Sequence, residues 1–303
     1  MAAVTPVVLA LDVGGTKVLG GLVTPAGEVL RTREASTAAP GGADPGLRTT
    51  RDVARRLAGD ASGVGEVVAV GAGFPEYVRA GELRSHEVLA WTGQPAGLLA
   101  AVVPGVPCVV ESDVRCGAIG EAVLGAGAGL RSVLYAAWGT GLSSTVVLDG
   151  RPLTGERGEA IALGELGVSS VVDAGWEGNL ERYASGQGVA ERYSALTGDA
   201  VRGAVDVARR AAGGDACAAA VLESAGRAVG TALGWLVAVL DPAAVVLGGG
   251  LGTATTPAAD AARQAYDDTV ARRPHPPSLI PARLGSRAGL IGAALAAVVQ
   301  TRG

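Results

Sequence analysis

The sequence predicts a two-lobed α/β protein. Strand, helix and glycine-turn patterns alternate along its 303 residues, as is typical of α/β folds. One pattern also occurs twice: apolar strand, Gly/Thr turn, apolar strand and reverse turn run through LALDVGGTKVLGGLVTPAG from Leu9 and LYAAWGTGLSSTVVLDG from Leu134. Because 303 residues are long for a single core, we expect each copy to belong to its own lobe.

Composition argues against several classes of protein. The formal net charge of −4 comes with no basic stripe, so nucleic-acid binding is not expected. Cys108, Cys116 and Cys217 form no closely spaced pair, which disfavours disulfides and a thiolate zinc site. The N-terminus lacks a signal-peptide pattern, and the apolar run 228–240 is shorter than the roughly 20 residues that span a bilayer. We therefore expect a cytoplasmic protein without a membrane partner.

The first lobe is expected to carry chemistry at strand ends. ADPGLRTTRDVARRLAG predicts a helix with Asp44 as N-cap, Pro45 in its first turn and Gly59 past its end. EVVAVGAGFPEYV predicts a strand that runs into a Gly/Pro turn, and PCVVESD predicts a strand that ends at Glu111 and Asp113. Carboxyl ends of α/β strands often deliver functional groups.

The second lobe is expected to be richer in helix. VRCGAIGEAVLGAG indicates a helix that leads into the second copy, so the lobe boundary is expected close to residue 115. The Gly-rich, acidic stretch 153–172 is interpreted as a substrate or connecting loop. Later elements are helices at about 180–196, 201–212, 217–240, 256–272 and 288–299, and short strands at AAVVLGGGLG and near Ala282.

The first turn combines a carboxylate with a phosphate-binding pattern. Small residues let backbone N–H groups approach phosphate oxygens closely, and a carboxylate beside them can hold magnesium through water. The residues concerned are Asp12, Gly14, Gly15, Thr16 and Lys17. A plain hairpin bend with a solvated Lys17 is the alternative.

Two further glycine turns have the same character. They are Gly139, Thr140 and Gly141 in the second copy, and Gly248, Gly249 and Gly250 after the apolar VVL strand. A backbone without Cβ atoms can pass close to a flat base. Taken singly, each of these turns is also compatible with an ordinary loop. The recurrence of the first pattern therefore carries the prediction of a nucleotide site.

Four other polar residues are candidates for acceptor chemistry. Asp113, between a strand and a helix, can accept a hydroxyl proton as general base, although its position alone favours a helix N-cap. His86 and Glu87 precede Trp91, and polar groups beside an aromatic plate suit a carbohydrate, with an ordinary surface loop as alternative. Glu165, in LGELG, either accepts sugar hydroxyl hydrogen bonds or points to water.

Together these motifs resemble the ROK family of sugar kinases, within the actin-like, hexokinase-like ATPase superfamily. LDVGGTK resembles its first phosphate loop, ESD its catalytic-Asp segment, GTGLSSTVVLDGRPLTG its second phosphate hairpin, LDPAAVVLGGGLG its adenosine segment and AGLIGAALAA its closing helix. The resemblance implies a two-lobed actin-like ATPase (RNase H-like) fold with duplicated lobes around a central cleft. Residues 1–115 with a closing helix at about 288–303 would form one lobe, and 116–287 the other.

The resemblance also implies roles for individual residues. Asp113 becomes the general base, in place of the N-cap interpretation, and Asp12 orients a magnesium ion through water. The three glycine turns bind ATP. Glu165 corresponds to the sugar-binding Glu of the family's Glu-x-Gly-His motif, and His86 and Glu87 are expected to contact the substrate. A homodimer is expected on the same ground.

Three departures from the family pattern change the expected acceptor site. Val168 replaces the motif's His, which binds both a structural zinc and a sugar hydroxyl, and Asn179 stands at a Cys position in WEGNLERYASG. We therefore expect no zinc. Ser112, an expected substrate contact, stands where the family commonly has Asn. Because sites that bind a hydroxyl reject analogues lacking it, these changes imply an acceptor other than plain glucose, such as an amino sugar, N-acyl sugar or cyclitol.

The sequence thus predicts a magnesium-dependent kinase that transfers the ATP γ-phosphoryl group to a hydroxyl of a sugar or sugar-like polyol. A catalytically weak sugar- and nucleotide-binding sensor of the same family is the alternative. A sugar-responsive transcriptional repressor would need a DNA-binding segment before the first turn, where only 11 residues precede Asp12. The adenosine-like glycine segment favours ATP over polyphosphate as donor.

Overall fold

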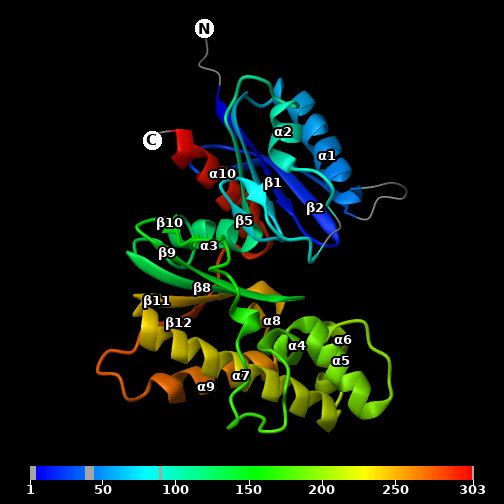
Figure 1. The fold of residues 1–303 in the computed structure, drawn as a ribbon, viewed down its shortest axis with the longest axis vertical. Coiled ribbons are helices and arrows are strands. Elements are labelled where there is room, and N and C mark those ends of the chain that lie inside the picture. The colour runs from blue at the N-terminus through cyan, green and yellow to red at the C-terminus, as the bar shows by residue number, and fades with distance from the viewer. Residues whose placement is uncertain (1–4, 38–43, 89–90, 302–303) are drawn as a thin grey trace. The chain divides into compact units, whose positions relative to one another are not determined.

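The computed structural model describes residues 5–37, 44–88 and 91–301, which form two compact units (Figure 1). The first unit consists of Met1–Ala128, Gly150–Ile161 and Ser286–Gly303, and the second of Gly129–Asp149 and Ala162–Gly285. Each unit contains a sheet and helices, so the predicted two-lobed α/β class is confirmed. The expected boundary at residue 115 lies inside helix α3 (Asp113–Val123), which belongs entirely to the first unit.

The first unit is built on a five-stranded sheet with the order β3-β2-β1-β4-β7. Its strands are β1 (Pro6–Val13), β2 (Lys17–Val23), β3 (Val29–Ser36), β4 (Glu66–Phe74) and β7 (Cys108–Ser112). β2 lies antiparallel to β1 and β3, whereas β4 runs parallel to both β1 and β7. The carboxyl ends of β1, β4 and β7 therefore meet at one edge of the sheet.

Both faces of this sheet are buried, because alternate residues of its strands face different helices. Val7 and Leu9 of β1 pack in one cluster with helix α1 (Pro45–Ala61), whereas Val8 packs with helix α10 (Ala288–Thr301) on the opposite side (Figure 1). The shorter elements of the unit are α2 (Pro95–Ala100), β5 (Val78–Arg79), β6 (Glu82–Leu83) and β10 (Arg151–Pro152).

Helix α10 approaches the sheet and α3 closely, because glycines lie at the contact points. A Cβ atom on Gly292 would overlap the carbonyl oxygen of Cys116 in α3. A Cβ atom on Gly71 of β4 would overlap the carbonyl oxygen of Ala293. Backbone at this distance leaves room for a hydrogen atom alone, so these two glycines fix α10 on the sheet.

The second unit contains a sheet with the order β9-β8-β11-β12. Its strands are β8 (Ser132–Trp138), β9 (Leu142–Leu148), β11 (Ala244–Gly248) and β12 (Ser278–Pro281). β8 and β9 form an antiparallel hairpin, and β11 runs parallel to both β8 and β12. Both sheets therefore contain the same motif, an antiparallel hairpin whose turn carries the Gly/Thr pattern.

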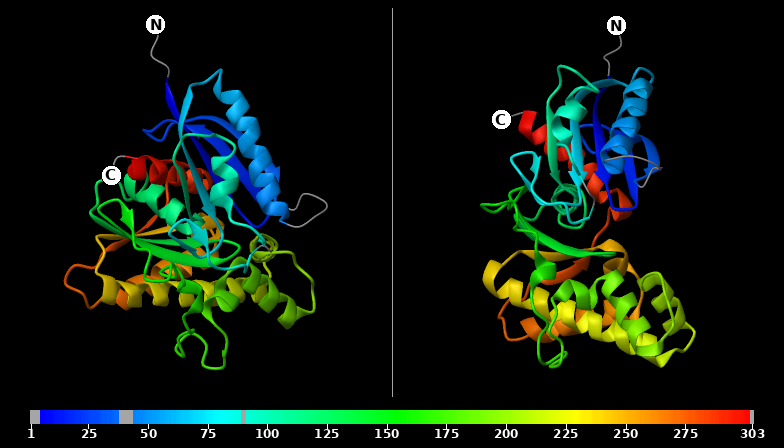
Figure 2. Two further views of the ribbon diagram at one scale, coloured as in Figure 1. Left: turned by 45° about the horizontal axis from the view of Figure 1, so that its top comes forward. Right: turned by 45° about the vertical axis from the view of Figure 1, so that its right-hand side comes forward.

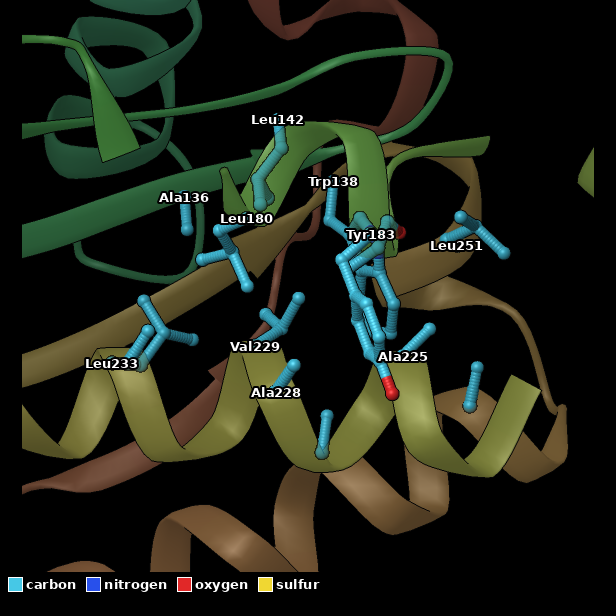
Figure 3. Packing of buried hydrophobic residues seen from close by; sticks show 14 of the residues in the cluster. Ala136, Trp138, Leu142, Leu180, Tyr183, Ala225, Ala228, Val229, Leu233 and Leu251 are labelled. Atoms are coloured by element: carbon cyan, nitrogen blue, oxygen red, sulfur yellow. Dashed lines mark hydrogen bonds between the residues drawn. The ribbon is translucent and has the colours of Figure 1, made fainter. Parts of the chain in front are cut away.

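The helices of the second unit pack around one large core, part of which Figure 3 shows. They are α4 (Leu180–Ala184), α5 (Gly186–Thr197), α6 (Ala204–Ala212), α7 (Ala216–Leu240), α8 (Gly249–Thr253) and α9 (Pro257–Val270), with 3-10 turns η1 (Leu163–Glu165) and η2 (Gly285–Arg287) near the unit's ends. α7 and α9 lie side by side (Figure 2). Within the described ranges, no helix combines the length and apolarity that crossing a membrane requires.

The helix predicted over 180–196 is interrupted. α4 ends at Ala184, and Ser185 adopts an extended conformation in which its Oγ accepts a hydrogen bond from the N–H of Gly188 at 3.1 Å. Ser185 is therefore the N-cap of a second helix, which the continuous apolar periodicity of the sequence concealed.

The start of α1 also differs from its prediction. Asp44 occupies the N-cap position, but its φ of 53° is left-handed and its side chain makes no capping bond in the described structure. Its carboxylate instead accepts hydrogen bonds from the N–H and hydroxyl of Thr92. The helix also continues through Gly59 to Ala61.

We expect opposite effects from alanine at two helical glycines. Gly292→Ala should lower the thermal unfolding midpoint by about 4–8 °C, because its methyl group would overlap the α3 backbone. Gly59→Ala should leave the midpoint unchanged or raise it slightly, since no described atom lies within 4 Å of its Cβ position. Circular dichroism melts measure both, and equal midpoints would contradict the close packing of α10.

Candidate functional site

Acidic residues gather at the carboxyl edge of the first sheet. Asp12 of β1 lies opposite Gly73 of β4, and Phe74, the next residue of β4, lies opposite Ser112 of β7. Asp113 directly follows Ser112 as the first residue of α3. Asp12 and Asp113 are 101 positions apart in the sequence. The register of the three parallel strands brings both to the same edge of the sheet.

The first Gly/Thr turn has its carbonyl groups tied into the protein. Gly14 N–H donates to the Lys17 carbonyl at 2.8 Å. The fully buried Thr37 donates its N–H to the Thr16 carbonyl at 3.0 Å and its hydroxyl to the Gly14 carbonyl at 2.7 Å. Among the described residues, the N–H groups of Gly15 and Thr16 have no acceptor. A turn with its N–H groups left over is an anion-binding arrangement.

Lys17 does not point its charge at that turn in this structure. Its Nζ donates to Glu34 Oε2 at 2.8 Å, and both side chains are about half exposed. An exposed ion pair of this kind contributes little stability and can be exchanged for a phosphate at small cost.

The second Gly/Thr turn is tied back in a different way. The first residues of α5 donate to its carbonyls: Gly186 N–H to Gly139 at 2.7 Å and Gln187 N–H to Thr140 at 3.3 Å. Gly139 N–H donates to the Gly141 carbonyl at 3.0 Å. For Thr140 and Gly141 N–H, the described part of the chain offers no acceptor. This turn is therefore a second arrangement suited to an anion.

In the third glycine cluster, two glycines lie at close packing contacts and one has open space beside it. A Cβ on Gly248 would lie 2.6 Å from the hydroxyl of Tyr135, and one on Gly249, whose φ is 81°, would overlap the carbonyl of Trp138. Gly250 has no described atom within 4 Å of its Cβ position. Gly248 thus serves the contact of β11 with β8, Gly249 serves that of α8 with β8, and Gly250 is the one of the three with room beside it.

Asp113 is a buried carboxyl group whose pKa lies near neutral pH. Burial, and secondarily the charges of Asp12 and Glu76, raise the pKa of Asp113 to about 7. Its Oδ1 accepts a hydrogen bond from Val114 N–H at 2.6 Å. The N-cap position of α3 belongs to Ser112, so the capping interpretation of Asp113 does not hold. A carboxyl group with this pKa is suited to accepting a proton near neutral pH.

Asp12 has a similar environment. Burial raises the pKa of Asp12 to about 6, against the opposing effect of the Lys17 charge. Its carboxylate lies over the first turn of α10, where a Cβ on Gly289 would be 2.6 Å from Oδ2. The described residues contain no group of three potential metal ligands. A lone carboxylate fits a magnesium ion that keeps most of its waters.

The predicted substrate contacts differ in exposure. His86, Glu87 and Glu165 are exposed. Ser112 is fully buried, and its Oγ has no hydrogen-bond partner within the described chain. A buried hydroxyl without a partner is costly, and it lies directly beside Asp113.

Trp91 is not a carbohydrate platform, which corrects the expectation from the sequence. Its exposed fraction is 4%, and its ring stands edge-on to Phe74 with centroids 5.5 Å apart. Its Nε1 donates to Glu76 at 3.0 Å. The side chain belongs to the core of the first unit, so the stacking surface that the sequence suggested is not available.

Glu76, which sequence reasoning missed, organises the loop that carries His86. Its buried carboxylate accepts hydrogen bonds from the Ser85 hydroxyl, the N–H groups of Glu87 and Val88 at 3.0 Å each, and the Trp91 indole. Val88 in turn packs against the first Gly/Thr turn, since a Cβ on Gly15 would lie 3.1 Å from it. Glu76 therefore holds the loop against that turn. The Pro-Glu-Tyr sequence gave no local signal for this.

Arg115, also missed, anchors the helix that begins with Asp113. Its side chain is fully buried, with Nε 2.7 Å from Glu111 Oε1. Its guanidinium donates to the carbonyls of Val78 at 2.5 Å and Thr154 at 3.2 Å. Burial raises the pKa of Glu111, against the opposing effect of the Arg115 charge. The planar fork of an arginine suits this junction of three segments.

Residues 8–300 match the ROK family. A glucokinase of Streptomyces coelicolor is 30% identical, over 94% of this chain and 96% of the relative. A ROK hexokinase from Thermus thermophilus is similar in structure, with a TM-score of 0.82, 32% identity and coverage of 98% of this chain and 99% of that chain. A ROK family glucokinase from Streptomyces griseus, solved with glucose and AMPPNP, has a TM-score of 0.79, 28% identity and coverage of 98% and 100%.

We expect Glu76→Gln to loosen the loop that carries His86. The amide group cannot accept the hydrogen bonds that one carboxylate oxygen accepts, so the variant should lose about 1–3 kcal/mol of stability. Exchange of the Glu87 and Val88 amide hydrogens should accelerate at least about tenfold.

Glu82→Gln is the matched control for this variant. Glu82 forms an exposed ion pair with Arg84, whose loss should change stability by less than ~1 kcal/mol. Hydrogen exchange followed by NMR measures both variants. Unchanged protection of residues 87 and 88 in Glu76→Gln would show that the loop does not depend on this carboxylate.

Proposed function

Since this chain belongs to the ROK family and is an ATP-dependent carbohydrate kinase, we propose that it transfers the γ-phosphoryl group of ATP to a hydroxyl of a sugar or sugar-like polyol, with Asp113 as general base. One observation carries the assignment of the base. In the first unit, a carboxyl group whose pKa is raised to about 7 lies at the edge of the sheet where an N–H-lined turn begins.

The glycine turns bind the phosphates of ATP. Phosphoryl transfer depends on positioning and on stabilising charge at the phosphate oxygens. Gly15 and Thr16 supply backbone N–H donors in the first unit, and Thr140 and Gly141 supply them in the second. Gly250, with open space beside its Cα, is suited to pass close to the adenosine.

Asp12 orients a magnesium ion through bound water. The ion supplies positive charge at the phosphate oxygens during transfer. Its charge also favours the ionised form of Asp12, which burial alone disfavours. Lys17 exchanges its exposed ion pair with Glu34 for a phosphate oxygen and so neutralises phosphate charge at the same turn.

Asp113 accepts the proton of the attacking hydroxyl. Burial and the neighbouring charges of Asp12 and Glu76 make the carboxylate a stronger base than an ordinary aspartate. Asp113 belongs to the first turn of α3, and that helix is held by the buried Arg115. The base is thereby fixed in position, as catalysis by proximity requires.

The acceptor is bound by Glu165, His86, Glu87 and Ser112. The three exposed side chains offer hydrogen-bond groups to hydroxyls. The Ser112 hydroxyl, which is buried beside Asp113 and has no partner within the described residues, is the fourth proposed contact. Val168 can make no such bond. We therefore propose an amino sugar, N-acyl sugar or cyclitol rather than plain glucose as acceptor.

Asp113→Asn should abolish most turnover without harming the fold. Loss of a general base lowers kcat by about 10²–10⁴-fold. Isothermal titration should show ATP binding largely intact. Coupled measurement of ADP release with a panel of sugars and cyclitols gives kcat, and Asp52→Asn on the exposed side of α1 is the control.

The same variant should be more stable than the wild type at pH 8. The raised pKa of Asp113 means that the folded state binds a proton between about pH 4 and 7 that the unfolded state does not. Stability from this group therefore falls as pH rises through that window, and removing the charge should restore ~1–3 kcal/mol. Full turnover in Asp113→Asn would contradict the assignment of the base, whereas ligand binding without ADP release in the wild type would favour a sensor.

The pH dependence of kcat/KM should show one acid limb. Because Asp113 must be ionised and its pKa is about 7, kcat/KM for the acceptor should fall about tenfold per pH unit below pH 7 and level off above it. Initial rates between pH 5.5 and 9 at saturating MgATP measure this. A flat profile down to pH 5.5 would exclude a base with this pKa.

A further inference from the structure

One loop of the second unit lacks regular structure over most of its length. It runs from Leu166 to Leu180, directly after Glu165. Its base is closed by a hydrogen bond from Leu180 N–H to the Leu166 carbonyl at 2.7 Å and by an antiparallel bridge between Gly167 and Asn179. Loops of this length lose much conformational entropy when they are ordered. Some interaction inside the loop has to offset that cost.

A structural zinc ion, which the family's motif binds at this place, does not fit this loop. Residues 163–181 contain neither His nor Cys, the ligands that structural zinc sites use. Three of the side-chain oxygens in this range also accept backbone hydrogen bonds. Asn179 Oδ1 accepts from Arg182, Asp173 Oδ1 accepts from Gly175, and Glu181 Oε1 accepts from Leu142, each at 3.0 Å.

An aromatic stack occupies the interior of the loop instead. The ring of Trp176 meets Tyr183 of α4 edge to face, with centroids 5.1 Å apart and an interplanar angle of 72°. Arg192 of α5 places its Cζ 3.6 Å from the centroid of the same Tyr183 ring. Both geometries are attractive. Trp176 Nε1 also donates to the Asn179 carbonyl at 3.2 Å, which ties the stack to the closed base.

The backbone of the loop is shaped to admit this tryptophan. A Cβ atom on Gly178 would lie 2.9 Å from the Trp176 ring, so a larger residue at 178 would displace it. Val168 and Val172 join Trp176 in packing against the main core of the unit. Position 168 therefore serves apolar packing, which stabilises the same loop.

The stack is anchored in the core and connected to the second glycine turn. Arg192 donates to the Tyr183 carbonyl at 3.0 Å and to Ser224 Oγ of α7 at 2.8 Å. Tyr183 and Trp138 lie in one buried cluster (Figure 3). Trp138 Nε1 donates to the Ala184 carbonyl at 2.7 Å, and Trp138 directly precedes Gly139. The core that anchors the stack thus also holds the residue before the turn, through a contact that does not involve Trp176.

We propose that the Trp176–Tyr183–Arg192 stack, in place of a metal ion, fixes the loop 166–180 and so positions Glu165 for the acceptor. The positioning of Glu165 rests on the proposed function. The stack itself is independent of it, because every contact in it lies within the second unit. Trp176 is a positioning residue in this scheme and does not touch the substrate.

Hydrogen exchange and metal analysis test the stack without any activity. In Trp176→Ala, the amide hydrogens of Leu180 and Arg182, which donate to the Leu166 carbonyl and to Asn179 Oδ1, should exchange at least about tenfold faster than in the wild type, whereas Trp176→Phe should retain most of the protection. Trp235→Ala, at a half-exposed tryptophan of α7, is the matched control and should leave both amides unchanged. Purified wild-type protein should hold no stoichiometric zinc, and a zinc-selective chelator should not change its unfolding midpoint.

Kinetics test the role of the loop in acceptor binding. With D-glucose and N-acetyl-D-glucosamine as probes, Trp176→Ala should raise the acceptor KM about tenfold or more and leave the ATP KM within about twofold, and Trp176→Phe should restore the acceptor KM. A zinc ion per chain, or unchanged exchange in Trp176→Ala, would overturn the proposal. Faster exchange with an unchanged acceptor KM would overturn the link to Glu165. If the wild type turns over neither probe, the proposed function fails for these sugars, while the exchange and zinc results still decide the role of the stack.

Discussion

Backbone carbonyl groups that point into the protein determine what both Gly/Thr turns can bind. A peptide group carries its N–H opposite its C=O, so fixing the carbonyl oxygens inward turns the next N–H groups outward. Thr37 does this in the first unit, and the start of α5, at Gly186, does it in the second. An ordinary hairpin bend has no such support. The duplicated sequence pattern therefore marks a shared backbone arrangement, while the supports of its two copies are unrelated.

Burying carboxyl groups at the edge of the first sheet costs folding free energy, and the proposed function gives these groups a role in ligand binding. Glu76 is buried but offsets its desolvation with hydrogen bonds from a whole loop. At Asp113 the hydrogen bond from Val114 N–H opposes the effect of burial, and at Asp12 the charge of Lys17 does so, but burial still raises the pKa of both carboxyl groups. Their repulsion destabilises the free protein. Under the proposed function, a magnesium ion beside Asp12 would relieve this repulsion, and the strain that it removes would strengthen binding of the magnesium nucleotide.

Local patterns predicted the strands, the turns and the acids at strand ends, because alternation and turn chemistry act over a few residues. Long-range contacts were out of reach. Thr37 bonds to a turn 23 positions earlier, and Glu76 to a loop whose partners lie up to 15 positions later. Trp91 looked like an exposed plate because sequence shows residue type without burial. Gly249 looked like a ligand loop, although its missing Cβ serves contact with Trp138.

The altered acceptor motif can be explained if two roles of the family's histidine are considered separately: fixing the loop and binding a sugar hydroxyl. A histidine that binds both a metal ion and a sugar hydroxyl fills both roles. Its loss alone should therefore leave the loop without the metal ion that fixes it. Here the loop is held by Trp176, and Val168 adds to the same packing. Under the proposed function, binding of that hydroxyl falls to Glu165 alone at this part of the motif. With one polar group fewer, less free energy would separate acceptors that differ at that hydroxyl, so a substituent there would be tolerated that a hydroxyl-binding histidine would reject.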